Sequence, residues 1–182
     1  KKGFNHENVS IAVVVQRMIN ADKSGVMFTV HPATGEKEKL IIEAGWGLGE
    51  GVVSGAVTPD HYVVDKNTGE VTDTEVMRKE IMFVRSSRAG GTEKRQVPED
   101  KAEKQVLTEA EIKKLADLGK LVEEHYEFPQ DIEWAIEGDE LYLLQSRPIT
   151  VFYGEEKAEE GSKKDVLIKG LGASPSLGSG RV

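Results

Sequence analysis

The 182-residue sequence contains no cysteine, which excludes disulfide bonds and metal sites built on thiolates. Any metal ion would have to be bound by oxygen or imidazole ligands. No run approaches the roughly 20 apolar residues that cross a membrane, and the charged start at 1–4 is not followed by the apolar core of a signal peptide. The sequence therefore predicts a soluble cytoplasmic protein that has no membrane partner.

Basic residues are in deficit, because 24 lysines and arginines face 32 acidic residues and give a formal net charge of −8. This balance argues against sequence-independent binding of nucleic acid phosphates. A polyanionic ligand would need a local basic group or a metal ion. With 38% hydrophobic residues, the chain can bury the core of about one domain. It begins at Lys1 rather than Met and ends at Val182 in a strand-like stretch, which predicts a piece of a longer protein.

Alternating and β-branched segments predict a largely antiparallel sheet. A first hairpin is expected to join residues 11–19 to 26–30 through a turn at 21–25. A second hairpin is expected to join residues 61–65 to a strand that begins at Val71, since the residues between them include Asn and Gly.

Residues 40–44 predict a buried strand, and the segment 45–51 that follows is too rich in glycine for a helix and is typical of a ligand-approaching loop. Thr108 and Glu111 form a capping-box pattern, and apolar residues repeat at helical spacing up to His125. Together these features predict an α+β fold, mainly antiparallel sheet with one main helix.

The segments 130–137 and 141–147 alternate like two paired strands. Tyr142 and Leu144 are expected to share a face with the apolar residues of the first strand. Directly opposite residues share a face, so this requires an even-sum register with Glu133 opposite Gln145, and hence a loop with an odd number of residues. A three-residue loop at 138–140 satisfies the condition, whereas a two-residue turn would place Glu133 beside Leu144.

The opposite face of this strand pair then presents Asp131, Glu133, Gln145 and Arg147 together. Carboxylate and amide oxygens are ligands suited to Mg²⁺, and a guanidinium can bind phosphate oxygens in a fork. The alternative is a solvated polar stripe with an ordinary Asp–Arg pair, and spacing alone favours that alternative. Arg85 and Arg88 could also meet phosphate, with a flexible surface loop as the default interpretation.

Four segments resemble, in order, the ATP-binding domain of the family that contains phosphoenolpyruvate synthases and pyruvate phosphate dikinases. They are Val15–Ile19, Ser24–Thr29, the glycine-rich Gly47–Gly55 with Thr58–Asp60, and the pair Asp131–Trp134 and Leu144–Thr150. Neither the dinucleotide pattern nor the P-loop pattern fits the glycine cluster. The resemblance implies that residues 1–152 are the C-terminal part of an ATP-grasp domain, that 153–165 are a charged linker and that 166–182 begin a swivelling phosphohistidine domain.

By this resemblance, the whole enzyme converts pyruvate, ATP and water to phosphoenolpyruvate, AMP and phosphate through a phosphohistidine, as in gluconeogenesis. Glu133 and Gln145 would bind Mg²⁺, Asp131 would support the metal and ribose-phosphate region, and Arg147 would contact phosphate. Gln16, Arg17 and Met18 would line the adenine. The acceptor histidine would lie beyond Val182, so this piece holds no catalytic residue, meets pyruvate only through other domains and is expected to be inactive alone.

Three alternatives remain open from the sequence. A rifampicin-type antibiotic phosphotransferase and a pyruvate phosphate dikinase would have the same arrangement of an ATP-grasp domain and a swivelling domain. They differ from a phosphoenolpyruvate synthase in the phosphoryl acceptor. A non-catalytic nucleotide-binding or structural module belongs to a different class. Calorimetry with MgATP tests this last class, since a structural module would show no heat of binding.

Overall fold

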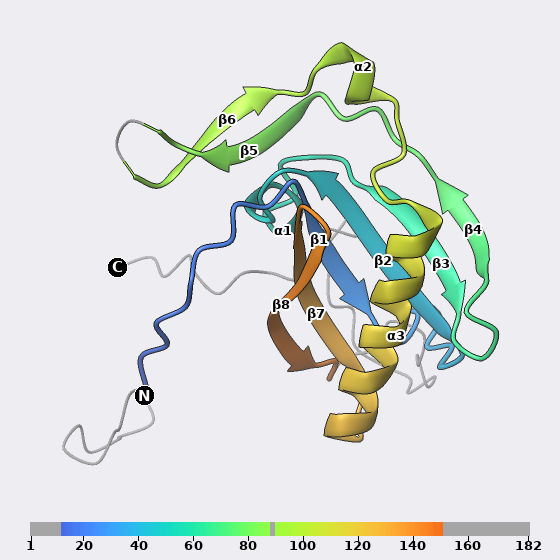
Figure 1. Ribbon diagram of the computed structural model, residues 1–182. Helices are drawn as coiled ribbons and strands as arrows, with labels where there is room; N and C mark the ends of the chain where they lie inside the picture. The colour runs from blue at the N-terminus through green and yellow to red at the C-terminus, as the bar shows by residue number, and fades with distance from the viewer. Residues whose placement is uncertain (1–11, 88–89, 151–182) are drawn as a thin grey trace, which may run out of the picture.

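The computed structural model describes residues 12–87 and 90–150, which form a six-stranded sheet, a two-stranded hairpin and three helices (Figure 1). The strands are β1 (Lys23–Phe28), β2 (Lys39–Trp46), β3 (Asp60–Asp65), β4 (Val71–Glu75), β5 (Ile81–Arg85), β6 (Thr92–Gln96), β7 (Gln130–Glu137) and β8 (Glu140–Pro148). The helices are α1 (Glu50–Val53), α2 (Glu99–Ala102) and α3 (Glu109–Tyr126). The predicted linker at 153–165 and the predicted second domain at 166–182 lie outside the described residues.

The main sheet has the order β4–β3–β2–β1–β7–β8, and every neighbouring pair is antiparallel. The predicted second hairpin is confirmed as β3 and β4, the predicted buried strand as β2, and the predicted strand pair as β7 and β8. The structure therefore has the expected α+β composition, with a mainly antiparallel sheet and α3 as the one long helix.

The predicted first hairpin is wrong. Residues 12–21 form no strand, and three valines of this segment, Val13, Val14 and Val15, are 82–94% exposed. Both edges of β1 are occupied by β2 and β7, so β1 has no free edge for a partner that precedes it in the chain. β-branched composition predicted a strand here, but a strand also needs an open edge with which to pair.

Gly25 shows why the turn prediction failed as well. It lies inside β1, opposite Ala44 on one side and Trp134 on the other. A Cβ atom at Gly25 would lie 1.8 Å from the carbonyl oxygen of Glu43 and 2.8 Å from the Trp134 ring. Glycine is therefore required for close packing within the sheet rather than for a turn.

Helix α3 begins at the predicted capping box. The backbone N–H of Thr108 donates to the Glu111 carboxylate at 2.7 Å, and the Glu111 N–H donates to the Thr108 hydroxyl at 3.3 Å. The Nζ of Lys23 also lies 2.7 Å from the Glu111 carboxylate, so an ion pair ties the start of α3 to β1. The helix prediction is confirmed at both its start and its approximate length.

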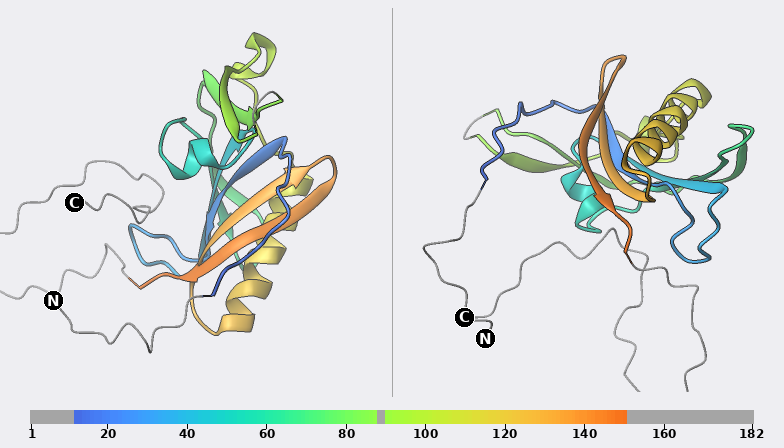
Figure 2. Two further views of the ribbon diagram at one scale, coloured as in Figure 1. Left: turned by 90° about the vertical axis from the view of Figure 1, so that its left-hand side faces the viewer. Right: turned by 90° about the horizontal axis from the view of Figure 1, so that it is seen from below.

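The apolar side of α3 packs against one face of the main sheet, where the core lies. This core includes Met27, Ile42, Leu115, Ile132 and Trp134, all at most 2% exposed. Figure 2 shows α3 on that side of the sheet, with α1 and the β5–β6 hairpin on the other. No helix in the described part of the chain is long and apolar enough to span a membrane.

A buried carboxylate joins the β5–β6 hairpin to the main sheet. Asp60, at the start of β3, accepts hydrogen bonds from the Lys79 ammonium at 2.5 Å and the Tyr62 hydroxyl at 3.1 Å. It also accepts from the backbone N–H groups of Met77 at 3.0 Å and Val106 at 2.7 Å. Asp60 and Lys79 are both at most 1% exposed. The buried Asp60 carboxylate therefore binds both the segment that leads into β5 and the segment that follows α2, and all of its contacts there are with hydrogen-bond donors. We call this group of contacts the hairpin anchor.

The register of β7 and β8 matches the prediction at Glu133 and differs from it at the loop. Glu133 lies opposite Gln145, as predicted, but Glu137 pairs with Glu140, so the loop contains only two residues. A β-bulge at Leu144 supplies the extra residue that the three-residue loop was expected to supply. Gly138 takes a positive φ of 61°, as a two-residue hairpin turn requires at its first position.

The bulge also corrects the predicted apolar set of β8. Trp134 pairs with Leu143, and Ile136 pairs with Leu141, so these two leucines share the face that packs toward α3. Tyr142 pairs with Ala135 and therefore lies on the opposite face, contrary to the prediction. A single extra residue reverses the side-chain alternation on one side of the bulge only.

Candidate functional site

Four polar side chains meet on the face of β7 and β8 that lies away from α3. Asp131 is directly opposite Arg147, and Glu133 is directly opposite Gln145. The Asp131 carboxylate accepts from Arg147 Nε at 2.9 Å and lies 2.8 Å from a terminal guanidinium nitrogen. The register thus brings together the four residues predicted on this face. Asp131 is already paired, whereas the Glu133 carboxylate accepts no hydrogen bond from a described residue.

The pKa values of the Asp131 and Glu133 carboxyl groups lie above their ordinary range. Burial raises the pKa of Asp131, and the hydrogen bond and charge of Arg147 offset part of this rise. Burial raises the pKa of Glu133 as well, the charge of Asp131 raises it further, and Arg147 opposes both effects. Each group therefore gains from a nearby positive charge that stabilises its ionised form.

A third carboxylate, Glu43 of β2, lies on the same face and was missed by the sequence reasoning. Glu43 and Glu133 are both directly opposite Val26 of β1, one from each side. Burial, and then the charge of Asp131, raise the pKa of Glu43 to about 7. One signal was present in the sequence, since Glu43 is the only charged residue within the apolar run 40–44.

A cavity of about 380 Å³ opens beside Glu133. Its walls come from four parts of the chain: residues 16–19 with Ala21, residues 48–50 with Val53, Thr92 of β6, and Glu133, Ala135 and Leu144 of β7 and β8. The volume lies within the range of about 300–1,000 Å³ that is common for small-molecule sites. We call this cavity the sheet-edge pocket.

The sheet-edge pocket contains four of the predicted site residues: Gln16, Arg17, Met18 and Glu133. The side-chain amide of Gln16 donates to the carbonyl of Leu144 at 3.4 Å, which holds the segment before β1 against the bulge of β8. Met18 lines the pocket and is 52% exposed, so a ligand can reach this residue. Asp131, Gln145 and Arg147 are outside the pocket wall but share a sheet face with Glu133.

The glycine-rich segment 45–51 is partly different from the predicted loop. Its first two residues end β2, and Glu50 begins the short helix α1. A Cβ at Gly47 would lie 2.2 Å from the carbonyl oxygen of Phe83, and one at Gly51 would lie 2.9 Å from the Phe83 ring. These two glycines therefore admit the β5–β6 hairpin, while Gly49 lines the pocket.

The donor set on this face suits a hard divalent cation that keeps other ligands. No three His, Asp or Glu side chains among the described residues converge on one metal position. Glu133 and Gln145 nevertheless offer two oxygen ligands from directly opposite positions. Mg²⁺ commonly takes one or two protein ligands and completes its octahedron with water and substrate phosphates. The residues present fit a magnesium ion that arrives with a phosphate ligand.

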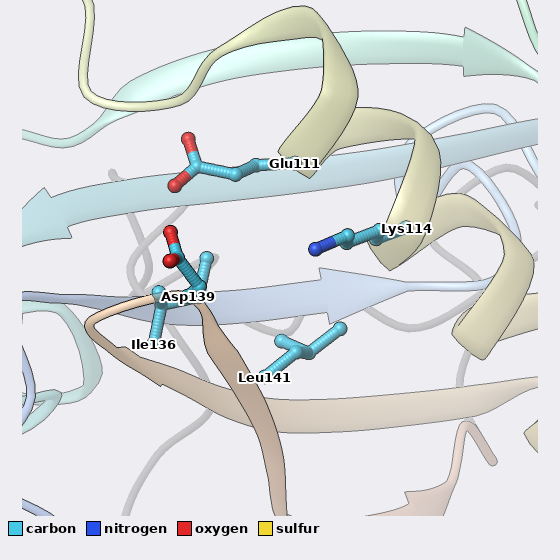
Figure 3. Close-up of a pocket in the computed structure, with 5 residues that line it drawn as sticks. All are labelled: Glu111, Lys114, Ile136, Asp139 and Leu141. Carbon is cyan, nitrogen blue, oxygen red and sulfur yellow. The ribbon is translucent and has the colours of Figure 1, made fainter.

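A second, smaller hollow lies on the α3 side of the sheet and is lined by Glu111, Lys114, Ile136, Asp139 and Leu141 (Figure 3). Its volume is about 40 Å³, which is room for about one water molecule and far too little for a nucleotide. Because Glu111 is already paired with Lys23, the charged lining of this hollow is part of the α3 attachment. The larger pocket is the candidate functional site.

Comparison with known proteins gives a match between residues 1–166 and the family described as pyruvate phosphate dikinase, AMP/ATP-binding domain. The chain is 52% identical, over its whole length, to a probable phosphoenolpyruvate synthase of Archaeoglobus fulgidus and to another of Methanothermobacter thermautotrophicus. It is 48% identical, again over its whole length, to a phosphoenolpyruvate synthase of Pyrococcus furiosus. The matched regions cover 24%, 26% and 24% of those proteins, so the chain spans about a quarter of their length.

Proposed function

The chain belongs to the pyruvate phosphate dikinase AMP/ATP-binding domain family, and we propose that it is the ATP-binding part of a cytoplasmic phosphoenolpyruvate synthase. The complete protein would convert pyruvate, ATP and water to phosphoenolpyruvate, AMP and phosphate. Whole-length similarity to proteins named phosphoenolpyruvate synthase supports this reaction over the antibiotic phosphotransferase and dikinase alternatives. The described residues would be the C-terminal part of an ATP-grasp domain.

The convergence of Gln16, Met18 and Glu133 on one pocket is the observation that carries the proposal. Residues 16–18 would line the adenine at one wall. Glu133 and Gln145 would bind Mg²⁺ from the sheet face, with Asp131 and Arg147 beside them. In such a site the protein orients the phosphates and neutralises their charge, and it forms no covalent bond with them.

Glu43 would complete the electrostatic environment of the metal. Its carboxyl group is partly buried, has a pKa near 7 and interacts with Asp131. A divalent cation on this face would stabilise the ionised forms of Glu43, Asp131 and Glu133 together. Nucleotide binding with magnesium should therefore release protons from the protein near neutral pH.

The proposal is tested by separating the two half-reactions in the complete enzyme. Glu133→Ala and Arg147→Ala should suppress phosphorylation of the enzyme by ATP and spare phosphoryl exchange between the phosphorylated enzyme and pyruvate. Glu140→Ala, which removes an equal charge from the exposed far end of the same strand pair, is the matched control and should affect neither step strongly. Equal loss of both half-reactions in the first two variants would mean that these residues support the fold and not the nucleotide.

The 182-residue chain by itself should show no phosphoenolpyruvate synthesis and should bind MgATP only weakly. Removing one preorganised donor from a charge-stabilising site commonly costs about 3 kcal/mol of transition-state stabilisation. Arg17 and Arg147, the two cations among the predicted site residues, are each already engaged by a carboxylate. Pyruvate-dependent release of AMP by this chain alone would contradict the proposal that the acceptor histidine and the pyruvate site belong to other parts of the complete enzyme.

A further inference from the structure

The β5–β6 hairpin turns one of its faces toward the sheet-edge pocket. Thr92 lines the pocket, and its hydroxyl donates to the Glu50 carboxylate at 2.5 Å. Arg85 is directly opposite Thr92, and Lys94 is directly opposite Phe83. Because opposite residues share a face, Arg85 and Lys94 lie on the same side of the hairpin as Thr92. Figure 1 shows this hairpin projecting from the main sheet beside α1.

The hairpin is held in this position by contacts of its own backbone with the glycine-rich segment. The backbone N–H of Leu48 donates to the carbonyl of Phe83 at 2.8 Å, and Gly47 forms an isolated bridge with the same residue. Gly47 and Gly51 lack the side-chain atoms that would keep Phe83 away. Contacts of the hairpin backbone and the missing side chains of the glycine-rich segment therefore both bring this face close to the pocket.

Arg85 and Lys94 differ from the other cations near the pocket because they are unpaired. Both are exposed, and neither forms an ion pair or hydrogen bond with a residue in 12–87 or 90–150. Arg17, by contrast, lies 3.7 Å from Glu137, and Arg147 is bound to Asp131. Arg95, on the other face of the same hairpin, is paired with Glu93.

The negative charge of the site explains why unpaired cations at its edge would favour the binding of an anionic ligand. The pocket wall and the adjoining sheet face carry the carboxylates of Glu43, Glu50, Asp131 and Glu133, which would repel a polyphosphate. Directly opposite residues of an antiparallel pair have Cβ atoms about 5 Å apart. An extended arginine at position 85 can therefore reach a ligand that touches Thr92. Its planar guanidinium can hold two phosphate oxygens at once.

We infer that the Arg85–Thr92–Lys94 face of the hairpin is a polyphosphate-binding wall of the sheet-edge pocket, with Arg85 as the principal contact. The ligand class is a magnesium-bound triphosphate chain. This inference rests on the proposed function for the identity of the nucleotide, but the anion contact itself depends only on the phosphates.

The test uses the whole 182-residue chain, labelled with nitrogen-15, and follows backbone amide shifts during titration. The probes are magnesium tripolyphosphate, MgATP and AMP. Arg85→Gln is compared with Arg95→Gln, which makes the same charge change on the opposite face of the same hairpin. Both positions are exposed, and thermal unfolding checks that both variants keep the parent stability.

Arg85→Gln should weaken binding of both triphosphate probes roughly tenfold, as expected for one charge-assisted contact, and leave AMP unchanged. Arg95→Gln should change binding by less than about twofold, consistent with the screening of a distant exposed charge. Equal effects of the two variants, or a parent chain that ignores tripolyphosphate, would overturn the inference. If tripolyphosphate binding depends on Arg85 but MgATP binds no tighter and leaves Met18 unshifted, the polyphosphate wall stands and the proposed adenine site fails.

Discussion

Lys79→Met should be among the most destabilising single changes in the chain, although Lys79 is outside the sheet-edge pocket. The substitution leaves the Asp60 carboxylate 0% exposed with three neutral donors and no cation. Breaking a buried ion pair by removing one partner costs about 3–5 kcal/mol. For a chain of this size each kcal/mol lowers the Tm by about 2–4 °C, so the expected decrease is roughly 6–20 °C.

Urea unfolding followed by tryptophan fluorescence measures this effect, since Trp134 lies in the core and Trp46 ends β2. Arg78→Met is the matched control, because it removes the neighbouring cation from two exposed pairs with Glu99 and Glu103. That control should leave the urea midpoint nearly unchanged. Equal midpoints for the Lys79 and Arg78 variants would refute the reasoning that the buried Asp60 carboxylate needs the Lys79 charge for stability.

Two further predictions concern the main sheet. Gly25→Ala should lower the free energy of unfolding by more than about 4 kcal/mol, because the added Cβ would collide with the Glu43 carbonyl. Gly49→Ala should be tolerated, because the nearest atom to its added Cβ would be 3.7 Å away. Thermal unfolding compares the two variants. Glu43→Gln should reduce a pH dependence of stability: the raised pKa makes the parent lose stability as pH rises from about 4.5 to about 7. Because the pKa values of Asp131 and Glu133 are raised as well, urea midpoints across that range should fall for both proteins, but less steeply for the variant than for the parent. Parallel curves would contradict the assignment.

Local patterns predicted those parts of the fold that depend on neighbours in the sequence. The capping box at Thr108 and Glu111 correctly gave the start of α3, because both partners lie within one turn. The turn between β3 and β4 was identified for the same reason. Face alternation also predicted the pairing of Glu133 with Gln145.

The failures came from interactions between distant parts of the chain. The composition of residues 12–19 could not show that both edges of β1 are taken by strands that follow later. Nor could alternation show whether the extra residue of the β7–β8 hairpin lies in its loop or in a bulge at Leu144. Glu43 was missed because its proximity to Asp131 depends on the strand order β2–β1–β7.

The β5–β6 hairpin illustrates the same limit at the candidate site. Arg85 was interpreted from its serine and glycine neighbours as part of a surface loop, but it ends strand β5. Its relation to the pocket depends on the pairing with Thr92 and on the packing of Phe83 over Gly51. No spacing rule in the sequence links these four residues.

The most direct test of the magnesium and nucleotide assignment replaces Mg²⁺ with paramagnetic Mn²⁺ and titrates the labelled chain with MnATP. Amide signals near the metal should broaden first at Glu133 and Gln145 and then at Met18 and Leu48, and Glu133→Gln should abolish this pattern. Broadening centred instead on Glu111 and Asp139 across the sheet, or unchanged by Glu133→Gln, would contradict the assignment of the sheet-edge pocket as the ATP site.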